Sequence, residues 1–167
     1  MTDARRLALL LALMFWQGGF MFYGAVVVPV GSAVLESDLA QGFITRRVTW
    51  YLNLLAIPAL ALWAWELLVA PRPRGFRWVC LILLTVMFAG QLLIHSHLDS
   101  HLDAEEMRVH DRASFSAWHA AYLSLSTAQW ALAVTLLGLT LRIWRRGPAD
   151  AASDVRRIER PANGDRP

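Results

Sequence analysis

A run of apolar residues, FRWVCLILLTVMFAGQLLIH, occupies positions 76–95 and contains a single charged side chain, Arg77. The hydrocarbon core of a bilayer is roughly 30 Å thick, and an α-helix of about 20 apolar residues crosses it. A helix also satisfies its backbone hydrogen bonds within its own segment, which lipid cannot do. The run therefore predicts a transmembrane helix.

Three further segments of similar length and composition predict three more membrane spans. They cover about residues 7–30, 48–69 and 116–144. Of the 167 residues, 56% are hydrophobic and only 17% are charged, which is too apolar for a soluble domain of this size. We expect one domain over residues 1–146, an all-α integral membrane four-helix bundle, with Pro29 and Gly31 ending the first span.

The arginines predict how the spans are oriented. If the N-terminus is cytoplasmic, 12 of the 16 basic residues lie on the inner side, and four lie outside: Arg46, Arg47, Arg108 and Arg112. Positive residues favour cytoplasmic loops, so both termini are expected in the cytoplasm, as in a multi-pass protein of a bacterial inner membrane. Residues 147–167 are expected to form a disordered cytoplasmic tail. A cleaved signal peptide is the alternative for the first span, although its apolar stretch is long for one.

Composition excludes some classes of site and partner. Cys80 is the single cysteine, so a disulfide framework and a multi-cysteine metal site are excluded. The net charge of +3 is distributed as the membrane orientation requires. We therefore expect a lipid bilayer as the partner of this chain, and not nucleic acid.

Polar side chains inside the spans concentrate in the half that faces outward. Every span contributes to this set: Gln17, Tyr23, Thr49, Asn53, Gln91, His95, His119, Tyr122, Ser126 and Gln129. Polar groups in a bilayer are costly unless they face one another or water, so we expect a shared cavity that opens outward. Hydrogen bonding between helices is the alternative role. The candidate residues for binding a cofactor are His95, His119, Tyr122, Gln91 and Asn53.

The inner halves of the spans are almost entirely apolar. Glu66 is an exception, and we expect its side chain to extend toward the inner membrane surface.

The run HSHLDSHLDAEE, residues 95–106, adds histidines and acids just beyond the third span. If the helix continues, residues four apart form two stripes: His95, Asp99 and Asp103, and His97, His101 and Glu105. Imidazole and carboxylate are ligands of divalent transition metals. The candidate metal ligands are therefore His95, His97, His101, His119, Asp99 and Glu105. The alternatives are a solvated surface, or a short tandem duplication that repeats HLD without selection for a metal.

Two patterns resemble a known family. They are the first-span pattern Trp16-Gln17-Gly18-Gly19 with Tyr23 and Pro29, and the pattern at the start of the last span, which contains Asp111, Arg112, Phe115, Trp118, His119 and Tyr122. These resemble small four-helix membrane proteins similar to transmembrane protein 205, which in bacteria form a domain of unknown function. The likeness covers about residues 7–142 and implies the four-span architecture. The anthrone-oxygenase-like proteins are similar in size and number of spans, and the His- and Asp-rich third loop departs from the family pattern.

Three functions are consistent with these observations. The first is an outward-facing, His-rich site that binds a transition metal or haem through His95 and His119. The second is a non-catalytic subunit, or assembly partner, of a larger membrane complex, or a homo-oligomer. The third is a membrane enzyme, oxygenase-like, that acts on a lipid-soluble substrate in the polar cavity, where Tyr122, Asn53 or Gln91 would orient an oxygen atom.

Overall fold

Four long helices make up nearly all of the structure, a computed structural model that describes residues 2–69, 75–103, 108–109 and 111–145. The first span is one continuous helix of five segments, α1 (Thr2–Leu13), η1 (Met14–Gly18), α2 (Gly19–Phe22), η2 (Tyr23–Val27) and α3 (Val28–Leu35). The other spans are α4 (Asp38–Leu54) with α5 (Ala56–Val69), α6 (Gly75–Ser100) and α7 (Arg112–Arg145). The predicted all-α fold with four long apolar helices is confirmed, and each of the four is long and apolar enough to cross a membrane. The expected tail, residues 147–167, lies outside the described residues.

The helices extend beyond the predicted spans at the end predicted to face outward, here called the outer end. The four candidate spans contain 26 to 34 residues each. At 1.5 Å per residue, a helix of 34 residues is about 50 Å long and exceeds the roughly 30 Å of hydrocarbon. Between α6 and α7, a two-residue strand β1 (Leu102–Asp103) pairs antiparallel with β2 (Arg108–Val109).

The prediction that Pro29 and Gly31 end the first span was wrong, because the helix continues to Leu35. A proline leaves the carbonyl four residues before it without a helical N–H partner. The π-helical turn η2 ends two residues before Pro29 and changes the hydrogen-bond register there, since the Val28 N–H donates to the Tyr23 carbonyl. The helix ends where Glu36 takes a left-handed conformation, with φ at 50°.

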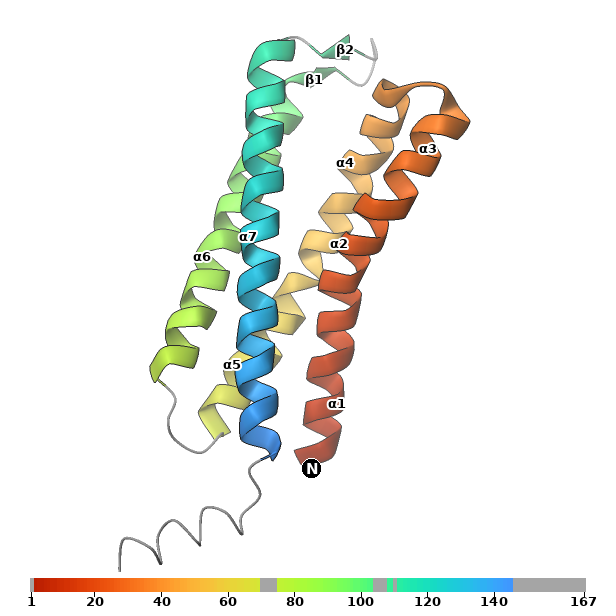
Figure 1. The fold of residues 1–167 in the computed structure, drawn as a ribbon. Coiled ribbons are helices and arrows are strands. Elements are labelled where there is room, and N and C mark those ends of the chain that lie inside the picture. The colour runs from red at the N-terminus through yellow and green to blue at the C-terminus, as the bar shows by residue number, and fades with distance from the viewer. Residues whose placement is uncertain (1, 70–74, 104–107, 110, 146–167) are drawn as a thin grey trace, which may run out of the picture.

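Pairs of helices define the shape of the bundle. Figure 1 shows α6 beside α7 and α3 beside α4, with the two pairs diverging toward the outer end. At the opposite, inner end α1 packs against α5. Gly31 allows α3 and α4 to approach closely, because a Cβ atom at this position would overlap the Gln41 side chain. The bundle is therefore closed at its inner end and open at its outer end.

The buried apolar core lies in the inner half, where it joins all four spans. Its largest fully buried side chains include Trp16, Trp63, Leu9, Leu67, Leu84 and Leu136. Many other large apolar side chains are exposed around the bundle, among them Phe22, Leu68, Val86 and Leu93. In helices of this length and composition, such side chains face the lipid.

Glu66 does not extend to the inner surface as expected, since its side chain is only 3% exposed. Its Oε2 accepts from Arg5 Nε at 2.7 Å, and its Oε1 accepts from Trp144 Nε1 at 2.6 Å. A buried carboxylate is tolerated when charged and hydrogen-bonded partners surround it. Glu66 therefore links the first, second and fourth spans at the inner end.

We expect replacement of Glu66 by Leu to destabilise the protein by about 1–3 kcal/mol, because it leaves the Arg5 cation and the Trp144 N–H without their acceptor. Thermal unfolding of detergent-solubilised protein measures this loss. Asp3→Leu is the matched control, since the Asp3 side chain is fully exposed. Equal stability of the two variants would show that the Glu66 contacts do not hold the inner end together.

Candidate functional site

A cavity of about 730 Å³ lies in the outer half of the bundle, between the two diverging helix pairs. Gln17, Gln91 and Gln129 line its deep end, while Ser32, Asp38 and Phe115 line its outer end. Most of the lining surface is apolar. Nine of the ten polar residues that the sequence places in the outer halves line it: Gln17, Tyr23, Thr49, Gln91, His95, His119, Tyr122, Ser126 and Gln129. The tenth, Asn53, does not line the cavity and is fully buried.

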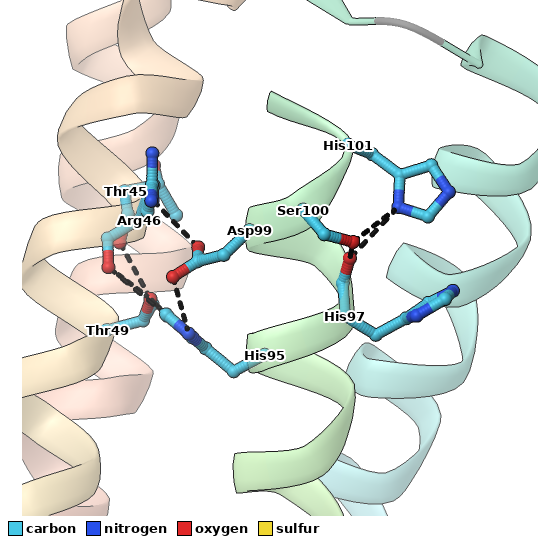
Figure 2. A network of polar contacts seen from close by, with 8 residues as sticks. All are labelled: Thr45, Arg46, Thr49, His95, His97, Asp99, Ser100 and His101. Atoms are coloured by element: carbon cyan, nitrogen blue, oxygen red, sulfur yellow. Dashed lines mark hydrogen bonds and ion pairs between the residues drawn. The ribbon is translucent and has the colours of Figure 1, made fainter. Parts of the chain in front are cut away.

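His95 projects from α6 toward α4, as Figure 2 shows. Its Nε2 lies 3.2 Å from the Arg46 carbonyl oxygen and 3.4 Å from Thr49 Oγ1. A carbonyl oxygen only accepts, so Nε2 is the protonated nitrogen in this arrangement. The other ring nitrogen, Nδ1, lies 3.7 Å from Asp99 Oδ2. Both nitrogens of this buried imidazole therefore face partners within the protein.

Asp99 connects the same two helices one turn further out (Figure 2). Its Oδ1 accepts from Arg46 Nε at 2.7 Å, and each side chain is about one-third exposed. Partly exposed ion pairs are screened by solvent and contribute little stability by themselves. The pair nevertheless fixes where α4 and α6 meet beside the cavity.

A chain of hydrogen bonds joins α6 to α7 below His95. Gln91 Nε2 donates to Ser126 Oγ at 2.7 Å, and Ser126 Oγ donates to the Tyr122 carbonyl at 2.8 Å. The Tyr122 hydroxyl in turn accepts from Asn53 Nδ2 on α4 at 3.3 Å. Among the described residues, Gln91 Oε1 and Asn53 Oδ1 are buried without a hydrogen-bond partner. One of these two residues, Gln91, lines the cavity, so the cavity lining includes an acceptor without a partner among the described residues.

His119 lies on α7 one turn before Tyr122 and also lines the cavity. Its ring stacks on Phe115, with 6.0 Å between centroids and 14° between planes. His95 and His119 therefore line one cavity from the two neighbouring helices of the same pair, α6 and α7.

His97 and His101 lie on a different face of α6 from His95 (Figure 2). The His97 ring lies 4.6 Å from the Trp118 ring of α7 and 4.7 Å from the His101 ring. His101 Nδ1 lies 2.9 Å from the His97 carbonyl oxygen, and His101 Nε2 lies 3.4 Å from Ser114 Oγ of α7. Neither histidine lines the cavity.

The structure divides the predicted metal ligands between two locations. His95 and Asp99 face α4, whereas His97 and His101 face α7. Glu105 lies outside the described residues. Within the part of the chain that the structure describes, no group of three or more His, Cys, Asp or Glu side chains is close enough to hold a metal ion. Metal binding by this set stays a prediction.

Sequence reasoning missed two participants in the outer half. Arg46 was placed in a loop but lies in α4, where it pairs with Asp99. Gln41 is buried, and its Nε2 donates to the Tyr23 hydroxyl at 3.3 Å. A signal was present, because four polar residues of α4 repeat every four positions and so share one helix face: Gln41, Thr45, Thr49 and Asn53.

We expect Asn53→Leu and Tyr122→Phe to be coupled in a double-mutant cycle. Each variant removes one side of the same interhelical hydrogen bond, so the coupling free energy should be about 0.6 kcal/mol and at most roughly 2 kcal/mol. Chemical unfolding in detergent measures it. Asn53→Leu with Thr127→Val is the control cycle, because the Thr127 hydroxyl donates to the Leu123 carbonyl of its own helix. Additivity in both cycles would contradict the contact.

Comparisons of this chain with protein-family models, with curated proteins and with solved structures gave no match. The resemblance to the family of transmembrane protein 205 therefore stays a prediction. Functional inference rests on the cavity and on the residues that line it.

Proposed function

We propose that this chain is a multi-pass membrane protein that binds a lipid-soluble small molecule in the outer cavity. The ligand carries a polar group on an apolar, ring-sized body. Following the orientation predicted from the arginines, the site faces the periplasmic side of a bacterial inner membrane. The proposal assigns binding to the site and no reaction.

The observation that carries the proposal is the size of the cavity and its mainly apolar lining with a few polar groups. Small-molecule sites measure about 300–1,000 Å³, and a few placed polar groups interrupt their apolar walls. The outer cavity has a volume of about 730 Å³ and a mainly apolar lining. Gln91, His95 and Tyr122 line the cavity and are held by hydrogen bonds between helices: Gln91 bonds Ser126 of α7, while His95 and Tyr122 bond Thr49 and Asn53 of α4. An apolar body and a polar group would both find matching surfaces.

Access from the lipid supports a lipid-soluble ligand. Met21 on the first span and Leu123 and Trp130 on the fourth span line the cavity. These apolar side chains are also 37–52% exposed. They form an apolar rim between the two spans, on the side where hydrocarbon would surround the protein. A molecule dissolved in the membrane would reach the cavity here without crossing water.

Haem or a transition metal is the second candidate ligand, and a specific observation favours it. His95 and His119 line the same cavity from α6 and α7. However, Nε2 of His95 faces the Arg46 carbonyl and Nδ1, the nitrogen left to bind a metal, faces Asp99 Oδ2 at 3.7 Å, so ligation by His95 would require the loss of the contact with Asp99. Because of this cost, we rank a metal centre second to an organic ligand.

We expect Gly24→Phe to abolish binding of a naphthalene-sized probe, because this position lines the cavity and a side chain here enters open space. Equilibrium dialysis of protein in nanodiscs against 1-naphthol, corrected for empty nanodiscs, measures the loss. Gly138→Phe is the matched control, since this helical glycine also faces open space but does not line the cavity. Wild-type binding no stronger than that of Gly24→Phe would contradict the proposal.

Removal of metal is expected to leave probe binding unchanged. Dialysis against a chelator, followed by metal analysis, an absorption spectrum and a repeated binding measurement, tests this expectation. The second candidate predicts the opposite result: a bound metal or a haem band that His119→Ala eliminates and that His97→Ala retains. Such a result would replace the organic ligand with a metal centre.

A further inference from the structure

We propose that the ligand of the outer cavity carries a hydroxyl group, as an alcohol or a phenol, and that Gln91 Oε1 accepts the hydrogen bond from this hydroxyl. The inference rests on the proposed function and specifies the chemical class of its ligand. It follows from the direction of each hydrogen bond in the chain that joins Gln91, Ser126 and Tyr122.

The orientation of the Gln91 amide is fixed by its neighbour. A serine hydroxyl has one hydrogen to donate. Ser126 donates it to the Tyr122 carbonyl at 2.8 Å, which is an acceptor only. The contact of 2.7 Å between Ser126 Oγ and the Gln91 amide must therefore have the amide N–H as its donor. While Ser126 donates to the Tyr122 carbonyl, rotation of the amide by 180° would place two acceptors against each other.

This orientation leaves the carbonyl oxygen of Gln91 without a partner. The side chain is 1% exposed, and its Oε1 has no hydrogen-bond partner among the described residues. Gln91 lines the cavity. A buried acceptor without a donor is unfavourable, and a hydrogen-bond donor brought by the ligand removes that penalty.

The Tyr122 hydroxyl supplies the complementary group. It accepts from Asn53 Nδ2, so its own proton remains available as a donor. Tyr122 lies one helical turn from Ser126, the residue that holds Gln91, and it lines the same cavity. The residues that line the cavity therefore offer one acceptor on α6 and one donor on α7. A hydroxyl group can satisfy both, whereas an ether or a ketone oxygen only accepts and leaves Gln91 Oε1 unpaired.

The test compares two probes that differ only in this hydrogen, 1-naphthol and 1-methoxynaphthalene. Each is measured by equilibrium dialysis against the full-length protein in nanodiscs, with correction for its partition into empty nanodiscs. Wild-type protein should bind 1-naphthol about tenfold more tightly than the methyl ether, as one well-placed hydrogen bond allows. This comparison needs no variant, so it stands even if a substitution prevents folding.

The Gln91→Leu variant tests whether Gln91 causes the preference for 1-naphthol over the methyl ether. It should lower the affinity for 1-naphthol to that for the ether and leave the affinity for the ether unchanged. Thr85→Val is the matched control, because Thr85 lies on the same helix, donates to the Leu81 carbonyl of that helix and does not line the cavity. The control should retain the preference for 1-naphthol.

The outcomes separate the inference from the function on which it rests. Equal binding of both probes to wild-type protein, or a preference that persists in Gln91→Leu, would overturn the hydroxyl assignment and leave the cavity as a binding site. Failure of both probes to bind above the level of Gly24→Phe would overturn the proposed function itself.

Discussion

A polar group in hydrocarbon has to find a partner inside the protein, and this constraint shapes both ends of the bundle. At the inner end, Glu66 satisfies it by accepting from Arg5 and Trp144, which brings three spans together. In the outer half, Gln91, Ser126, Tyr122 and Asn53 satisfy it only in part across α4, α6 and α7, since Gln91 Oε1 and Asn53 Oδ1 have no partner among the described residues. The first span contributes little to that outer network beyond the contact between Tyr23 and α4.

This unequal pairing accounts for the shape of the cavity. Apolar packing around Trp16 and Trp63 closes the inner half, so the helices cannot separate there. Further out, hydrogen bonds hold α6 to α7 and α6 to α4, while α2 and α3 stay with α4 and away from α7. The space between the first and fourth spans remains open as a result. The π-helical turns η1 and η2 lie in the same part of the first span, and such turns often occur at functional sites.

The four long apolar helices and the gathering of the polar residues in one half of the bundle were predictable from the sequence, because hydropathy acts locally along the chain. The helix ends were less predictable, since the π-turn before Pro29 carries no recognisable residue pattern. The Arg46–Asp99 pair depends on how closely two distant helices approach, and the burial of Glu66 depends on the positions of Arg5 and Trp144. The separation of His95 from His97 was available in advance, because residues two apart lie on different helix faces. The predicted set of metal ligands nevertheless included residues from both faces of the helix, His95 and His97.

Carbene labelling with a lipid-soluble diazirine, read out by mass spectrometry, most directly tests whether the outer half of the bundle contains a ligand-accessible cavity. The account predicts that the label modifies cavity residues such as Tyr122 and Gln91, and that 1-naphthol reduces this modification. Labelling of Leu93, which is 74% exposed on the outside of the bundle, should not change. Labelling of Tyr122 and Gln91 no greater than that of Leu84, which is fully buried in the core, would contradict the account.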